Sequence, residues 1–167
     1  MKTIACLLGI VLLPVAAFAA EKKSKAPVPN ASLSDVKWGK PVNTAGFDKN
    51  TLTGKVVVVE EWGVNCPECL AGLPKLAKMA KAGADKGLAV IGFECQNGTK
   101  ENILKVLKST RVEYPIQTWG SAPGNTEGSI PYVCVFDVTG KLVFNGSPSE
   151  DGFEAAVKKA LRDVKSN

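Results

Sequence analysis

The most apolar part of the chain is a run of four valines at residues 56–59, a pattern typical of a strand buried on both faces. In residues 70–81 apolar side chains recur at steps of three and four, with lysines on another face, which is the period of an amphipathic helix. Gly87 then interrupts the pattern, and residues 88–94 form a second apolar run. The pattern predicts a strand–helix–strand unit with a right-handed parallel crossover.

The second half of the chain continues this alternation of strands and helices and then changes to a β-hairpin pattern. Thr99 can cap a helix through residues 102–107, and residues 112–116 form a short extended piece. After a loop rich in Gly, Ser and Pro, apolar runs at 132–136 and 141–145 flank a turn and predict a β-hairpin. A last helix with one apolar face follows. We therefore predict one α/β domain in which a mixed sheet lies between helices.

The N-terminal residues have the three parts of a secretory signal peptide. Lys2 precedes an apolar run that is too short to cross a membrane comfortably, and an Ala-x-Ala cleavage site ends this segment. Cleavage after Ala19 removes residues 1–19, so residues 20–32 become a flexible linker before a domain at 33–167. The alternative is an uncleaved N-terminal anchor. Export predicts a periplasmic or otherwise extracytoplasmic location, where disulfides form and persist.

Composition and charge narrow the functional classes. Loss of Lys2 with the signal peptide lowers the formal charge from +5 to +4, and the other lysines are scattered, so nothing argues for nucleic-acid binding. The chain contains no histidine, which excludes a histidine-based catalytic dyad or zinc centre. Of five cysteines, four remain when Cys6 leaves with the signal peptide. We predict no cofactor.

Two of the remaining cysteines lie where the first strand gives way to the first helix. Cys66 precedes Pro67, which suits the first helical position, and Cys69 follows one turn later on the same side, so the two sulfurs can meet. Free N–H groups at a helix start favour negative charge and therefore stabilise a thiolate. We predict a redox-active disulfide in which Cys66 is the attacking thiolate and Cys69 is the buried resolving thiol.

With this pair in place, the chain resembles the thioredoxin-like proteins, and most closely the extracytoplasmic TlpA-type thiol–disulfide oxidoreductases. The resemblance rests on motifs spread along the chain: Gly54-Lys55, Trp62-Gly63, Cys66-Pro67-Glu68-Cys69, Pro74 and Ile130-Pro131. It implies a thioredoxin-like three-layer fold with a mixed central sheet flanked by helices. It also implies a reductant that exchanges disulfides with exported proteins and is recharged by a membrane thiol donor.

The resemblance further implies roles for residues around the pair. Pro131 should be cis and, with Ile130, should line the groove that receives a partner's backbone. Trp62 is assigned to the same partner-binding region, chiefly as a core side chain beside the active site. Pro74 should kink the active-site helix, because proline removes one helical hydrogen bond. Glu61 departs from the pattern, since relatives usually carry an apolar residue there.

Glu60 lies six residues before Cys66, where thioredoxins often carry a buried acid. A desolvated carboxyl there would have a raised pKa and could accept the proton of Cys69 as a general base. Side chains alternate along a strand, so Glu60 and Glu61 point to opposite faces. The alternative is that Glu60 is simply one of two glutamates near a strand end, one of them exposed to solvent.

Three further residues have open roles. Cys95 and Cys134 could form a second disulfide or act as two buried thiols. The resemblance places the valine strand between the strands of these two cysteines, which favours buried thiols, because two strand spacings exceed the reach of a disulfide. Trp119, in the loop rich in Gly, Ser and Pro, could recognise a partner or fix the loop.

Three functions are consistent with these residues. The first is a thiol–disulfide oxidoreductase in which Cys66 attacks a partner and Cys69 resolves the mixed disulfide. The second is a soft-metal carrier that binds Cu(I) through the same two thiolates, and the absence of histidine weakens it. The third is a non-catalytic secreted domain whose pair is a fixed disulfide. We favour the oxidoreductase.

Overall fold

The computed structural model of the protein describes residues 27–164. The predicted signal peptide at residues 1–19 and the first part of the predicted linker lie outside the described residues. Among residues 27–164, no helix combines the length and the apolar composition that a membrane span requires.

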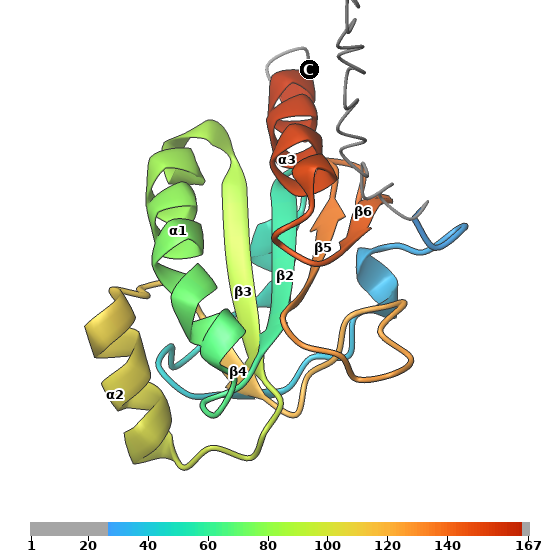
Figure 1. The fold of residues 1–167 in the computed structure, drawn as a ribbon. Helices are drawn as coiled ribbons and strands as arrows, with labels where there is room; N and C mark the ends of the chain where they lie inside the picture. The colour runs from blue at the N-terminus through green and yellow to red at the C-terminus, as the bar shows by residue number, and fades with distance from the viewer. Residues whose placement is uncertain (1–26, 165–167) are drawn as a thin grey trace, which may run out of the picture.

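The central element is one six-stranded mixed sheet with the strand order β1-β4-β3-β2-β5-β6 (Figure 1). Its strands are β1 Lys40–Pro41, β2 Val56–Trp62, β3 Leu88–Glu94, β4 Ile116–Thr118, β5 Tyr132–Phe136 and β6 Leu142–Gly146. β2, β3 and β4 run parallel, whereas β1, β5 and β6 are antiparallel to the strands beside them. The sheet thus joins the predicted parallel unit to the predicted hairpin.

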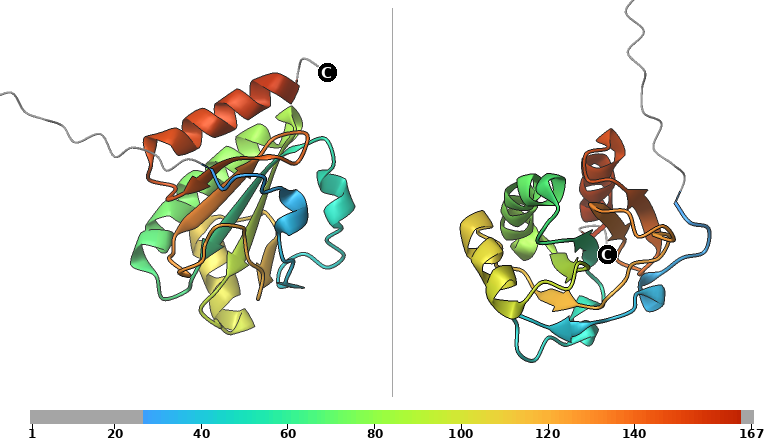
Figure 2. Two further views of the ribbon diagram at one scale, coloured as in Figure 1. Left: turned by 90° about the vertical axis from the view of Figure 1, so that its right-hand side faces the viewer. Right: turned by 60° about the horizontal axis from the view of Figure 1, so that its bottom comes forward.

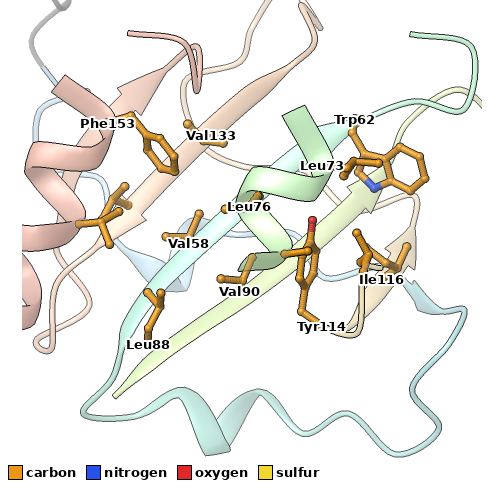
Figure 3. Packing of buried hydrophobic residues seen from close by; sticks show 14 of the residues in the cluster. Val58, Trp62, Leu73, Leu76, Leu88, Val90, Tyr114, Ile116, Val133 and Phe153 are labelled. Carbon is orange, nitrogen blue, oxygen red and sulfur yellow. The ribbon is translucent and has the colours of Figure 1, made fainter. Parts of the chain in front are cut away.

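The α-helices cover one face of this sheet (Figure 2). They are α1 Pro67–Gly83, α2 Lys100–Thr110 and α3 Asp151–Asp163. Their apolar sides pack with alternate residues of β2, including Val58 and Trp62, in one buried cluster (Figure 3). The predicted helical period of the first helix is confirmed, and Pro74 lies inside α1 as expected.

The opposite face of the sheet is covered by short segments before β2 and by the loop before β5. Val57 and Val59, the other alternate residues of β2, pack there with Leu52 of a 3₁₀ turn and with Ala122 of that loop. Since both faces are covered, all seven residues of β2 are buried. The fold class predicted from the sequence is confirmed, with irregular segments and 3₁₀ turns as the third layer.

Residues 27–32, which the sequence assigns to a flexible linker, lie against the domain. Val28 N–H donates a hydrogen bond to Asn145 Oδ1 at 3.0 Å, and Leu142 N–H donates to Ala31 O at 3.0 Å. The side chain of Ala31 is also buried. The packed domain therefore begins earlier than the predicted boundary.

The sheet differs from the sequence pattern in two places. β4 lies further along the chain than the extended piece predicted at 112–116. Pro115 has no N–H to donate, and the side chain of Asn43 bonds to Tyr114 O and to Ile116 N–H instead. The pattern does not predict β1, because two residues are too few to show a period.

The start of α2 depends on Thr99, whose Oγ1 accepts a hydrogen bond from Asn102 N–H at 3.3 Å. A Thr99→Ala variant lacks this cap, so we expect its free energy of unfolding to fall by about 1 kcal/mol, measured by urea denaturation. Lys105→Ala, on the exposed side of the same helix, is the matched control and should stay within about 0.5 kcal/mol of wild type. An equal loss in the two variants would contradict the capping role.

The carboxyl ends of β2, β3 and β4 and the amino end of β5 meet at one edge of the sheet, at the bottom of Figure 1. This edge comes forward in the right-hand view of Figure 2. In the strand register, Trp62 of β2 lies beside Glu94 of β3, and Glu61 lies beside Tyr132 of β5. The topology therefore gathers the predicted site at the edge where α/β sheets commonly bind their ligands.

Candidate active site

The disulfide between Cys66 and Cys69 lies at the start of α1. Cys66 is the N-cap residue and Cys69 belongs to the first turn, with their Cα atoms 5.2 Å apart. The N–H of Cys69 donates a hydrogen bond to Cys66 Sγ at 3.2 Å. Pro67 begins the helix and has no N–H that would need a partner. The structure thus contains the disulfide that the spacing of the two cysteines predicts.

The two cysteines differ in their access to solvent. Cys66 is 8% exposed, whereas Cys69 is 0% exposed. Only Cys66 can therefore meet an incoming partner. Its sulfur lies at the positive end of the α1 dipole, and the hydrogen bond from Cys69 N–H favours the charged form of this sulfur. Once reduced, this arrangement can place a nucleophilic thiolate at the surface and a second thiol behind it.

Two side chains that the sequence analysis does not single out hold the loop between β2 and α1. Val64 N–H donates to Glu94 Oε1 at 3.3 Å, and Asn65 N–H donates to Gln96 Oε1 at 2.8 Å. Glu94 is only 1% exposed. A carboxyl at the end of an apolar strand is the sequence signal that could have identified it. These two bonds fix the peptide groups that lead to Cys66.

Glu60 is on the same face of β2 as the cysteine pair, because it alternates with Val58 and Trp62, which pack against α1. Its side chain is buried, and its Oε2 accepts a hydrogen bond from the Tyr114 hydroxyl at 2.9 Å. Burial raises the pKa of Glu60 to about 7, and the bond from Tyr114 opposes this increase. The carboxyl can therefore exchange a proton near neutral pH.

Glu61 points to the opposite face, as the alternation predicts, and it is buried as well. Burial raises the pKa of Glu61, and hydrogen bonds from Ala122 N–H and the Asn125 side chain oppose the increase. The alternative in which one of the two glutamates is exposed is therefore wrong. Tyr114 is a further residue that the sequence does not reveal, because its contact with Glu60 joins positions far apart in the chain.

Ile130 and Pro131 are half-buried just before β5, and the peptide bond between them is cis. Because β5 pairs with β2, this bond lies beside the strand that leads to the disulfide. Trp62, in contrast, is 0% exposed and packs in the core near Leu73 and Ile116 (Figure 3). Its assignment as a partner-binding residue is wrong, because a fully buried side chain cannot touch a partner. It is a core side chain beside the site.

The two other cysteines of residues 27–164, Cys95 and Cys134, are free thiols on either side of β2. Cys134 is buried as predicted, and its Sγ donates a hydrogen bond to Pro123 O at 3.3 Å. Cys95 is exposed, so the prediction of a buried thiol is wrong there, because the residue follows β3 and lies outside the sheet. Its Sγ donates to Phe93 O at 3.3 Å. Although the Cys95 residue is exposed, its sulfur is partly desolvated and lies near the Glu61 and Glu94 carboxyls, and together these raise the pKa of its thiol to about 12. Burial, with a smaller effect of the Glu61 carboxyl, raises the pKa of Cys134 to about 12 as well, so neither thiol is a ready nucleophile.

Trp119 follows β4 at the same edge of the sheet. Its side chain is 67% exposed, and its backbone is left-handed, with a φ of 65°. An indole this exposed is not packed into its own loop, so the alternative in which Trp119 fixes the loop is wrong. Recognition of a partner by Trp119 stays a prediction.

Within 27–164, no group of three or more His, Cys, Asp or Glu side chains is placed to hold a metal ion. The chemistry that the site offers is that of a thiol pair, with a buried carboxyl on the same face of β2.

Comparison with curated proteins gives a partial match. No protein-family model matches the sequence. The proteins named DipZ from Mycobacterium bovis and Mycobacterium tuberculosis are 27% identical over 136 residues, which is 74% of this chain. The match covers 20% of DipZ, so the chain spans about a fifth of the length of these relatives.

Solved structures match over nearly their whole length. A thioredoxin-family thiol:disulfide interchange protein from Chlorobium tepidum has a TM-score of 0.61 at 24% identity, over 81% of this chain and 96% of that one. A thiol-disulfide isomerase from Corynebacterium glutamicum has a TM-score of 0.65 at 22% identity, over 84% and 99%. A secreted Mycobacterium tuberculosis disulfide oxidoreductase homologous to E. coli DsbE has a TM-score of 0.59 at 20% identity, over 76% and 96%. These likenesses show that the chain has the fold of these thioredoxin-family thiol:disulfide interchange proteins.

Proposed function

We propose that the protein is an exported thiol–disulfide oxidoreductase that reduces disulfides in exported proteins. The observation that carries this proposal is the disulfide at the start of α1, in which Cys66 alone meets solvent. The names of the structural neighbours support it, since they include a thiol:disulfide interchange protein and a secreted disulfide oxidoreductase.

The reduced form would work in two exchange steps. The Cys66 thiolate attacks one sulfur of a partner disulfide, that S–S bond breaks, and the other partner sulfur leaves as a thiolate. Cys69 then loses its proton and attacks Cys66 Sγ, which releases the first partner sulfur and closes the Cys66–Cys69 disulfide. Two electrons pass from the protein to its partner. The burial of Cys69 fits this second role, because its only accessible target is the adjacent sulfur.

Glu60 acts in this scheme as the general base for Cys69. It shares a face of β2 with the pair, and burial brings its pKa to about 7. A base with a pKa near the working pH can take a proton in one step and release it in the next. Tyr114 holds the carboxyl by donating to Oε2.

Location and recharging follow from the same proposal. The signal-peptide pattern of residues 1–19 and the secreted relative support an extracytoplasmic, periplasmic location. Each turnover leaves the pair oxidised, and an oxidising compartment does not reduce it again. A membrane thiol donor that carries electrons outward is therefore part of the proposal.

Equilibration with glutathione buffers tests the direction of transfer. We expect the Cys66–Cys69 couple to have a midpoint potential near the value of about −270 mV typical of thioredoxin, measured as the alkylated fraction by mass spectrometry. A value near about −120 mV, that of a strong oxidant, would contradict the reductant role and leave thiol exchange intact. A pair that neither glutathione nor an excess of dithiothreitol reduces would contradict the oxidoreductase itself.

A further inference from the structure

Glu61 is a buried carboxyl that the proposed thiol chemistry does not use. It lies on the face of β2 opposite the cysteine pair, with Val57 and Val59. A strand residue in this position is expected to be apolar, since a buried carboxyl is costly without partners. Its hydrogen-bond partners therefore indicate its purpose.

Both carboxylate oxygens of Glu61 are occupied by the loop that leads to β5. Ala122 N–H donates to Oε1 at 2.5 Å, and the Asn125 side-chain amide donates to Oε2. The same Asn125 amide also donates to Ser129 O at 3.0 Å. One amide thus connects β2 to the residue just before Ile130.

Other buried polar groups on the same face hold the middle of this loop. Pro123 O accepts hydrogen bonds from the Tyr132 hydroxyl at 3.0 Å and from Cys134 Sγ at 3.3 Å. Asn145 Nδ2 in turn donates to the Tyr132 hydroxyl at 3.0 Å. A Cβ added to Gly124 would lie 2.7 Å from that hydroxyl, so the loop already packs as closely as its backbone allows. The loop is therefore fixed from β2, β5 and β6.

We propose that Glu61 and Asn125 form a clamp that positions Ile130 and Pro131 for contact with a partner polypeptide. The clamp acts on the end of the loop, since Asn125 bonds to Ser129 O. Pro131 directly precedes β5, which pairs with β2 beside the strand that leads to Cys66. The inference rests on the proposed function, because it assigns residues that serve the partner of that same site.

The clamp lies away from the reacting sulfurs, so its effect on partner binding can be told apart from any effect on the thiol chemistry. Loss of the Asn125 amide leaves a Glu61 oxygen buried without that donor, so the loop must move or admit water. Glu60, Cys66 and Cys69 lie on the other face of β2 and keep their contacts. Binding of a large partner should weaken, while the reactivity of the pair should not change.

The test compares a protein disulfide with a small one. The substrates are insulin, with dithiothreitol to recycle the pair, and 5,5′-dithiobis(2-nitrobenzoate), which is too small to need the loop. For Asn125→Ala we expect KM for insulin to rise about tenfold, with kcat and the rate with the small disulfide within about twofold of wild type. Glu127→Gln, an exposed residue of the same loop, is the matched control and should behave as wild type.

Glu61→Gln is the second variant. It keeps an acceptor for Ala122 N–H but turns an NH₂ group toward the Asn125 amide, so the same rise in KM is expected. An unchanged KM in a folded variant, an equal loss with both substrates, or failure of both variants to fold would overturn the clamp. A wild-type protein that does not reduce insulin would instead contradict the proposed function, and the clamp with it.

Discussion

A Cys66→Ser variant is expected to lose reduction of protein disulfides almost completely, with kcat/KM at least about a thousandfold below wild type. A serine hydroxyl does not ionise near neutral pH, so the nucleophile at the surface is lost. Cys69 cannot replace it, because its side chain is 0% exposed. Insulin reduction with dithiothreitol as the recycling thiol measures the loss.

Two other cysteine variants complete this experiment. Cys69→Ser keeps the attacking thiolate but cannot resolve the product, so it should accumulate a mixed disulfide visible on a non-reducing gel. Cys95→Ser changes an exposed thiol outside the pair and should keep wild-type turnover. Turnover that survives in Cys66→Ser, or that disappears equally in Cys95→Ser, would refute the assignment of the nucleophile.

A Glu60→Gln variant is expected to change the pH dependence of stability by about 3 kcal/mol between pH 4 and pH 8. Burial raises the pKa of Glu60 from 4.5 to about 7 in the folded protein. Between these values the folded protein holds a proton that the unfolded chain has released. This contribution to stability is complete below about pH 4.5 and is lost as the pH rises through about 7. The glutamine variant has no such proton, so relative to wild type it gains stability as the pH rises.

Urea denaturation of the oxidised proteins at pH 4 and pH 8 measures the difference. Glu127→Gln, at an exposed position, is the control and should track wild type at both values. The same Glu60→Gln protein should also lose the inflection near pH 7 from its rate profile if Glu60 serves Cys69. A variant that follows the wild-type stability curve would show that this carboxyl is not desolvated in the folded protein.

Much of the site could be predicted from the alternation of side-chain directions along one strand. Residues 56–59 identify β2, and a period of two then places Glu60 and Glu61 on opposite faces, as the structure shows. Spacing also predicts the Cys66–Cys69 disulfide, because three residues make about one turn of a helix. These features depend on neighbours in the chain, so the sequence shows them directly.

The errors have a common cause. The placement of Cys95 in the core and the partner-binding role of Trp62 are wrong, whereas the expectation that Trp62 is chiefly a core side chain is confirmed, because exposure depends on the neighbours in space. The site residues that the sequence did not reveal were missed for the same reason, because they lie far along the chain from the residues they contact. Tyr114, Glu94 and Gln96 reach the site across 54, 30 and 31 residues of chain, and no local pattern reports such contacts.

The sequence alone determined the strand–helix unit, the thiol pair at its helix start and the faces of the two glutamates, since each follows from a period or spacing within a few residues. Tertiary structure alone decided that both glutamates are buried, which groups donate to them, and which cysteine meets solvent. The physical reason is that desolvation and hydrogen bonding depend on distant segments brought together by the sheet order. Those segments give Glu60 its raised pKa and tie Glu61 to the loop before Pro131.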